Sequence, residues 1–351
     1  MNKGIVIAAI FALMAFIAVD HLGRPKADVL VSQPSYDALI KQINKNELRN
    51  LHSLLVWRQG EVELELYRET KGMYGFETLD KVPVGPDVIH NVHSVSKSIT
   101  ALLLMIAIDD GKIDSVETPV LTYFPELNID SEDPRWAITL FDALNMETGL
   151  AIDELEPDYS DPNNDWTAMF QQTDLVSWIF AKDVAEAPGN TYRYTGAATM
   201  LLALAIERAY QQPIDTIAEE KLFLPLGITN YKWEKYPQND LVGADFGLRM
   251  TSRDLLKVGQ LILARGQWQN QTVIQPHWFD ALAESNAQAR HIASGYSHQF
   301  WLPEKLSGAI MAIGFGEQYL IVSPESDTVI VTTAGNYQGP QAIWRHIDAI
   351  L

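Results

Sequence analysis

Alternation of apolar and polar positions places short strands near both ends of the chain. The run SLLVWRQGEVELELY at residues 53–67 has two apolar segments separated by Gln59-Gly60, a pattern typical of a β-hairpin. The stretch GAIMAIGFGEQYLIVSPESDTVIVTTAG at residues 308–335 predicts three further strands joined by turns. Residues 72–87 are rich in glycine and proline, and they predict a loop.

Helical patterns fill the middle of the chain and its last residues. Each is marked by apolar periodicity together with a capping residue or a terminal glycine. Strands at both ends with helices between them favour one antiparallel sheet built from both termini, with a helical region inserted at roughly 112–280. The sequence therefore predicts an α/β (α+β) fold. The helical segments are 94–110, 142–150, 187–211, 251–266 and 339–351.

The N-terminus carries a separate apolar run. Lys3 precedes the uncharged residues 4–19, a pattern of secretory signals and signal anchors. Ile17-Ala18-Val19 is a poor cleavage site, so we favour an uncleaved anchor over a cleaved signal peptide. Residues 1–27 would then be anchor and linker, and residues 28–351 the folded domain. Both interpretations predict a periplasmic location outside the cytoplasm, and the favoured anchor also predicts attachment to the inner membrane by residues 4–19.

Charge and residue content exclude several classes of function. The formal net charge of -19 disfavours nucleic acid as a partner. The chain has no cysteine, which excludes thiolate metal sites and cysteine nucleophiles. The histidines show no metal-binding spacing, and no G-x-S-x-G elbow, P-loop or dinucleotide fingerprint occurs. We interpret the acidic stretch DELEPDYSDPNNDW at residues 153–166 as a solvated loop rather than a calcium site.

Ser94 and Lys97 form the first candidate for chemistry. In HSVSKSIT, residues 93–100, Lys97 follows Ser94 by three positions, and such positions share one helix face. Lysine can take the serine proton only if its pKa falls, which requires burial or a nearby cation. The alternative is a capping serine followed by a solvated lysine. Ser96 and Ser98 lack a lysine at this spacing and are expected to pack or cap.

Two later segments offer partners for this pair. Tyr194 in YRYTG precedes an apolar helix, and a tyrosine held near a lysine can relay protons; the alternative is ordinary core packing. In AIGFGEQY, residues 312–319, Gly314 and Gly316 permit close approach of a ligand to the backbone. An N–H from this strand could pair with the Ser94 N–H as an oxyanion hole; the alternative is a plain hairpin bend.

These segments occur in one order, and the chain resembles the serine β-lactamase and penicillin-binding-protein superfamily. It is most similar to the class C-like branch of esterases and amidases, including the 6-aminohexanoate-dimer hydrolase type. S-x-x-K is a signature of this superfamily. The resemblance runs from about residue 50 to the C-terminus and is carried by HSVSKSITALLLMIAIDDGKIDSVETPVLTYFPEL, ITLFDALNMETGL, PGNTYRYTGAATMLLALAIER, GLRMTSRDLLKVGQLIL and GFGEQY.

The resemblance implies a β-lactamase/transpeptidase-like fold, in which an antiparallel sheet flanked by helices meets an all-helical subdomain at the active site. It implies Ser94 as the acyl-enzyme nucleophile, Lys97 as its base and Tyr194 as the proton relay to the leaving group. It also implies an oxyanion hole made by the backbone N–H groups of Ser94 and Phe315. We expect the substrate to border Gly196, Gly314, Gly316 and Trp166. No metal or organic cofactor is implied.

Three departures from the superfamily pattern bear on specificity. Position 196 is glycine where the second motif is often Tyr-x-Asn, so the usual amide side chain is absent. Ala312-Ile313-Gly314 stands where true β-lactamases have Lys-Thr-Gly, and it supplies no cation or hydroxyl for a β-lactam carboxylate. Glu317 stands where glycine is frequent, and a carboxylate there would repel an anionic substrate; the alternative is a side chain that points away from the substrate. All three disfavour β-lactam hydrolysis without disfavouring acyl transfer.

The sequence therefore predicts a serine hydrolase, either a carboxylesterase or an amidase, acting on a small ester or amide or on a cell-wall peptide. One alternative is a non-catalytic, membrane-tethered protein that binds peptidoglycan or another ligand. A second alternative is a DD-peptidase or β-lactamase, against which the missing Lys-Thr-Gly counts. The sequence gives no indication of an oligomeric state.

Overall fold

The computed structural model describes residues 26–350, except 71, 75–76, 80, 160, 285–286, 289–294, 305, 338–342 and 348–349. The expected anchor at residues 4–19 lies outside the described residues, so it stays a prediction. Among the described residues, no helix is both long and apolar enough to span a bilayer.

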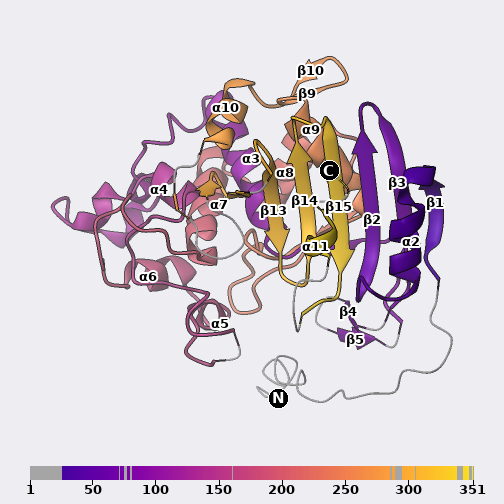
Figure 1. Ribbon diagram of the computed structural model, residues 1–351. Coiled ribbons are helices and arrows are strands. Elements are labelled where there is room, and N and C mark those ends of the chain that lie inside the picture. Colours follow the sequence, from indigo (N-terminus) through magenta and orange to yellow (C-terminus); the bar gives the residue numbers. More distant parts are fainter. Residues whose placement is uncertain are drawn as a thin grey trace.

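One eight-stranded antiparallel sheet forms the frame of the molecule (Figure 1). Its strand order is β1-β3-β2-β15-β14-β13-β12-β11, so strands from the two ends of the chain meet in the middle of the sheet. The pairing of β2 with β15, with Leu55 opposite Val331, joins the two ends. The antiparallel sheet predicted from both termini is thus confirmed. The strands are β1 Asp28–Ser32, β2 Leu51–Arg58, β3 Glu61–Tyr67, β11 Gly295–Ser297, β12 Phe300–Leu302, β13 Ile310–Gly314, β14 Gln318–Ser323 and β15 Thr328–Ala334.

The predicted hairpin at residues 53–67 is β2 and β3. Its turn consists of Gln59 and Gly60, both with positive φ, as a two-residue hairpin turn requires. The three strands predicted within residues 308–335 are β13, β14 and β15. The apolar runs were sufficient to find these strands because they are buried on both faces.

Helices lie beside the sheet and pack on it (Figure 1). Helix α9 contacts β2, β14 and β15, and a Cβ on its Gly259 would lie 2.4 Å from a Val329 methyl group. The glycine therefore sets how closely this helix approaches the sheet. The helices are α2 Asp37–Asn44, α3 Val95–Asp109, α4 Leu140–Leu144, α5 Asp165–Met169, α6 Leu175–Phe180, α7 Gly196–Tyr210, α8 Ile214–Ala218, α9 Ser252–Leu263, α10 His277–Ala283 and α11 Trp344–Ile347.

Short strands occur outside the main sheet, including in segments predicted as loop. The stretch 72–87 contains β4 (Gly72–Tyr74) and β5 (Glu77–Leu79), which pair only with each other. A further sheet in the order β6-β8-β7 lies beside the start of α3. Pairs this short carry too few residues to show a period of two, so the pattern missed them. Their bounds are β6 His90–Asn91, β7 Tyr231–Trp233, β8 Leu248–Met250, β9 Gln267–Trp268 and β10 Gln271–Thr272.

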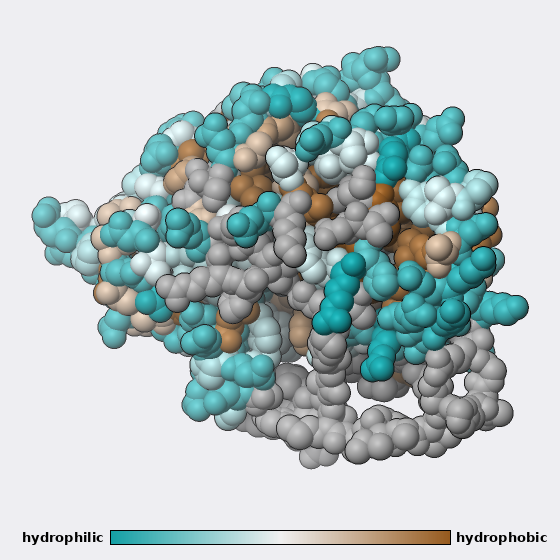
Figure 2. Space-filling view, in the orientation of Figure 1, coloured by the Kyte–Doolittle hydropathy of each residue, from teal (hydrophilic) through white to brown (hydrophobic). Residues whose placement is uncertain are grey.

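Two buried helices form the centre of the helical region. Helix α3 is buried from Val95 to Ala107 and contacts α7, which is buried from Gly196 to Ile206. Hydrophilic residues cover most of the coloured surface in the view of Figure 2. Because both helices are buried over most of their length, they fix the positions of Lys97 in the first turn of α3 and of Ser94 and Tyr194 just before the two helices.

Glu317 has a structural role, and of the two orientations left open by the sequence its carboxylate adopts the one directed into the protein. Its side chain is buried and accepts hydrogen bonds from the Ile343 N–H at 2.8 Å, the Trp344 N–H at 3.4 Å and the Asn336 amide. It therefore attaches the segment around α11 to the turn between β13 and β14. The sequence placed Glu317 next to the proposed oxyanion strand correctly but gave no sign of where its carboxylate points.

Glu317→Gln is expected to lower the free energy of unfolding by about 1–3 kcal/mol, because charge-assisted hydrogen bonds to buried N–H groups are weakened. Urea denaturation measures this change. The exposed Glu325 lies in the following turn, and Glu325→Gln is the matched control, expected to have no measurable effect. A change in KM for anionic esters without a change in stability would instead place the Glu317 carboxylate at the substrate.

Candidate active site

Ser94 lies at the start of α3, after a turn with unusual backbone geometry. His93 has a φ of 48°, and its N–H donates to the Asn91 side chain at 2.7 Å. The Ser96 hydroxyl donates to the His93 carbonyl at 2.6 Å. This turn leaves Ser94 half-exposed at the helix N-terminus, and its hydroxyl makes no capping hydrogen bond. The alternative of a capping serine therefore lacks its hydrogen bond.

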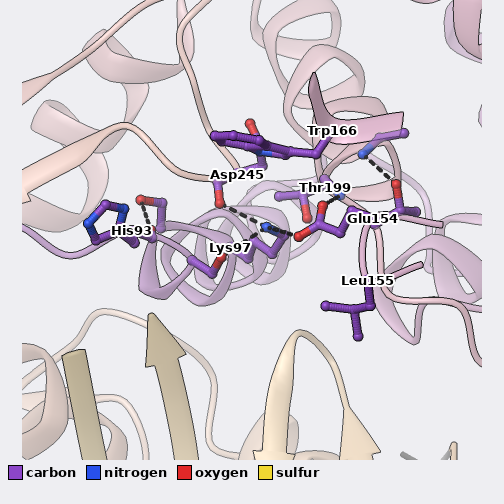
Figure 3. A network of polar contacts seen from close by, with 12 residues as sticks. His93, Lys97, Glu154, Leu155, Trp166, Thr199 and Asp245 are labelled. Atoms are coloured by element: carbon purple, nitrogen blue, oxygen red, sulfur yellow. Dashed lines mark hydrogen bonds and ion pairs between the residues drawn. The ribbon is translucent and has the colours of Figure 1, made fainter. Parts of the chain in front are cut away.

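Lys97 is buried, with 1% of its surface exposed, so the alternative of a solvated lysine is wrong. Its Nζ donates to Ser94 Oγ at 3.2 Å and to the Asp245 carbonyl at 3.0 Å. It also forms an ion pair with Glu154 Oε1 at 3.5 Å. Figure 3 shows the amine pointing between Glu154 and Asp245. The i, i+3 spacing thus brings the serine and lysine side chains together as expected.

Tyr194 lies two residues before the start of α7 and completes the cluster. It is buried, its ring centroid lies 4.9 Å from Lys97 Nζ, and Ser94 and Lys97 both lie close enough to its hydroxyl to favour its ionised form. Burial raises the pKa of Tyr194, and the neighbouring Lys97 charge opposes that rise. The structure therefore brings together all three residues for which catalysis was predicted.

Glu154 and Asp245 are buried acidic residues that the sequence did not single out. Glu154 belongs to the acidic stretch 153–166, and its 1% exposed side chain contradicts the interpretation of that stretch as a uniformly solvated loop. Its Oε1 accepts from the Tyr159 hydroxyl at 3.0 Å. Asp245 is fully buried, and its Oδ1 accepts from the Tyr236 hydroxyl at 2.9 Å. Acidic residues at such positions carry no local pattern that separates them from solvated ones.

The charge of Lys97 follows from these neighbours. Burial is the largest single influence and lowers the pKa of the lysine, but Glu154, Tyr194 and Asp245 together outweigh it, and the pKa is raised above its ordinary value. The lowered pKa that a lysine base requires is therefore not found in the free enzyme. Burial raises the pKa of Asp245 to about 6, and Lys97 opposes this rise.

Gly196 is the residue that makes room for both carboxylates. A Cβ at this position would lie 2.3 Å from Asp245 Oδ2 and 3.2 Å from Glu154 Oε2. The Gly196 N–H donates to Glu154 Oε2. The space that a Tyr-x-Asn side chain would enter is thus occupied by acidic groups from two other segments. Gly196 faces the catalytic cluster, although it offers no side chain to a substrate.

The hairpin between β13 and β14 lies beside the nucleophile. A Cβ on Gly314 would lie 2.2 Å from the Val92 carbonyl, so this glycine lets the strand approach the turn before Ser94. Gly316 has a φ of 86° and lies against the Tyr337 ring. Within the described residues, neither the Ser94 N–H nor the Phe315 N–H donates a hydrogen bond. Both are available as the oxyanion donors that the resemblance implies, and that role stays a prediction.

Aromatic side chains border the same region. Phe315 is 50% exposed, and its ring centroid lies 5.9 Å from that of Tyr159 and 6.1 Å from that of His93. Trp166 packs on Tyr159 at 5.6 Å and on Phe170 at 4.5 Å. Trp166 thus supports Tyr159, and Phe315 exposes an apolar side chain beside His93, the residue before Ser94. Among the described residues, no group of three or more histidine or acidic side chains could hold a metal ion.

Comparison with known proteins agrees with this geometry. The chain is 26% identical over 302 residues to a 6-aminohexanoate-dimer hydrolase of Paenarthrobacter ureafaciens, covering 80% of this chain and 71% of that protein. Among solved structures, a family VIII carboxylesterase superposes with a TM-score of 0.70 at 15% identity, covering 92% of this chain and 98% of that one. A penicillin-binding protein of Bacillus halodurans superposes with a TM-score of 0.69 at 14% identity, covering 89% and 99%.

These structural neighbours share the fold, which is the mixed α/β arrangement with an antiparallel sheet that the sequence predicted. Residues 37–348 match the protein family described as Beta-lactamase, and this match includes every element of the cluster around Ser94. The chain is therefore a hydrolase that belongs to the beta-lactamase family.

Proposed function

We propose that this protein cleaves small ester or amide substrates through an acyl-enzyme formed on Ser94. The observation that carries the proposal is one accessible hydroxyl that lies 3.2 Å from the amine of a buried lysine, which in turn lies against a buried tyrosine. A packed core has no need of a buried lysine directed at a half-exposed serine, because burying a charge is costly. If the protein were a non-catalytic binding protein, the free-energy cost of burying the Lys97 charge beside Ser94 would have no explanation.

The arrangement supports a defined path for the proton. In the free enzyme Lys97 carries its proton, so the base of this path is the ionised form of Tyr194, which the neighbouring Lys97 charge favours; this phenolate accepts the Ser94 proton as the serine attacks the carbonyl carbon. Tyr194 then returns that proton to the leaving oxygen or nitrogen as the scissile bond breaks. Water repeats the sequence to release the acid. The Lys97 charge stabilises the negative charge on Ser94 and Tyr194 during both steps.

The substrate is proposed to lack a carboxylate near the scissile bond. Ala312 is buried and offers no hydrogen-bonding side chain where the Lys-Thr-Gly cation would stand. Glu154 and Asp245 add negative charge to the site. Both features support an uncharged acyl donor over a β-lactam or a cell-wall peptide with a free carboxylate. We further propose that the enzyme works outside the cytoplasm, attached to the membrane by residues 4–19.

A substrate panel tests the proposal. We expect p-nitrophenyl esters of short acids to be hydrolysed at least about 100-fold faster, in kcat/KM, than a chromogenic cephalosporin, since one missing charge-assisted hydrogen bond has this magnitude. p-Nitroanilides of the same acids separate ester from amide preference. A fluorophosphonate probe should label the protein at Ser94. Labelling by fluorescent penicillin with no ester turnover would favour the DD-peptidase alternative instead.

A further inference from the structure

Glu154 is held in place by its own backbone and by its neighbours. Its N–H donates to the Tyr194 carbonyl at 3.1 Å, and its carbonyl accepts from the Asn164 side chain at 2.8 Å. Asn164 is itself fully buried and caps α5. The acidic stretch is therefore attached to the segment that carries Tyr194, and the Glu154 side chain starts from a fixed point.

The Glu154 carboxylate has hydrogen-bond donors on both oxygens. Oε1 accepts from the Tyr159 hydroxyl and faces Lys97 Nζ, while Oε2 accepts from the Gly196 N–H at the start of α7. A helix N-terminus favours negative charge. The carboxylate can reach this position only because residue 196 has no side chain. Its geometry is thus fixed independently of Lys97, as a group that orients another one requires.

Lys97 has no lone pair directed at Ser94. A protonated amine has three hydrogens and no acceptor, and here its contacts are Ser94 Oγ, the Asp245 carbonyl and Glu154 Oε1. The Asp245 contact is through the backbone, so Glu154 supplies the carboxylate that touches the amine. The other titratable groups facing Lys97 are Tyr194 and the Asp245 side chain; His93, Tyr159 and Tyr236 surround this cluster.

We propose that Glu154 is a positioning residue, whose carboxylate keeps Lys97 charged and directed at Ser94, so that the serine proton goes to the ionised form of Tyr194 that the Lys97 charge favours. This inference rests on the proposed function and adds a residue from outside the three catalytic candidates. Glu154 touches neither the substrate nor the reacting atoms. It acts through Lys97, which keeps all three hydrogens while one proton moves from Ser94 to Tyr194 and then to the leaving group.

Glu154→Gln tests the inference, because it removes the charge while its one oxygen can still accept from the Gly196 N–H; its NH2 group then faces the Tyr159 hydroxyl, which can accept instead of donate. Without the carboxylate, burial lowers the pKa of Lys97, so the amine loses its proton as the pH rises. We expect kcat/KM of the variant, divided by that of the wild type, to fall about tenfold or more between about pH 6.5 and about pH 9.5. A p-nitrophenyl ester and the rate of fluorophosphonate labelling provide the two readouts.

Tyr159→Phe is the matched control, because it removes a hydrogen bond from the same carboxylate and leaves the charge. Its ratio to the wild type should be independent of pH. A flat ratio for Glu154→Gln would overturn the inference, and so would a gain of activity at neutral pH, since that gain would mean that Glu154 suppresses a lysine base. A partly misfolded variant has fewer active sites, which the extent of fluorophosphonate labelling counts. Its rate then falls by the same factor at every pH.

The wild type supplies a measurement that needs no folded variant. With Glu154 in place, its labelling rate should not decline below about pH 10, since Lys97 keeps its proton there. A decline with a midpoint well below that value would overturn the inference. Ser94→Ala distinguishes failure of the proposed function from failure of the inference about Glu154. If that variant is still labelled and still hydrolyses ester, the assignment of Ser94 as nucleophile is wrong.

Discussion

Replacing Ser94 by alanine is expected to lower kcat/KM for p-nitrophenyl esters by about 10⁴-fold or more, the range found when a nucleophile is removed from a serine hydrolase. The reason is chemical: Lys97 and Tyr194 can move a proton, but neither replaces the oxygen that forms the acyl-enzyme. Steady-state ester hydrolysis and fluorophosphonate labelling measure the loss. Both should disappear together, while the free energy of unfolding should change little because Ser94 is half-exposed.

Ser98 provides the control for this prediction. It lies on the same helix, it is buried, and its hydroxyl donates to the Gln299 carbonyl at 2.7 Å, without a lysine three residues later. Ser98→Ala should therefore cost about 1 kcal/mol of stability and leave the active-site titre in place. Ser94→Ala retaining more than a tenth of the wild-type rate would contradict the nucleophile assignment.

Local patterns in the sequence were sufficient for the elements that carry the site. The apolar run after Ser94 predicted α3, and the i, i+3 rule placed Lys97 beside the serine, because both features depend on neighbours within one helical turn. The strands β13 to β15 were predicted from their own apolar runs and the turns between them, which are also local features. The position of Tyr194 against Lys97 needs the packing of α7 on α3, and no spacing along the chain supplies it. The prediction that Tyr194 belongs to the site came from the resemblance to known hydrolases.

The charge of Lys97 could not be predicted from its own segment. Burial was foreseen, and burial lowers the pKa of a lysine; the opposing carboxylate of Glu154 comes from a stretch whose composition is that of a solvated loop. One signal was present in the sequence. Glycine at position 196 removes a side chain from the centre of a polar site, and a close-packed interior fills such a space with other groups.

Replacing Gly196 by asparagine restores the usual second motif and is expected to damage the protein. A glycine near a helix N-terminus ordinarily gains stability when a Cβ is added. Here the Cβ would lie 2.3 Å from Asp245 Oδ2, so one carboxylate must move while buried. We expect the free energy of unfolding to fall by about 3 kcal/mol, at the upper end of the overpacking range. Thermal or urea unfolding measures the loss, and ester turnover should fall with it.

The cause of that damage can be assigned with two further variants. Gly196→Ala adds the Cβ without the amide and should produce most of the loss of stability; a stabilised Gly196→Ala would show that the site has room to spare. Asp245→Gly removes the nearest obstacle and keeps the backbone carbonyl that binds Lys97. In the double variant Gly196→Asn/Asp245→Gly, the two losses should be less than additive by at least about 1 kcal/mol, the coupling expected of groups competing for one space. Additive losses would mean that Gly196 and Asp245 affect stability independently. The acidic side chains around Lys97 would then not be the reason why residue 196 is a glycine.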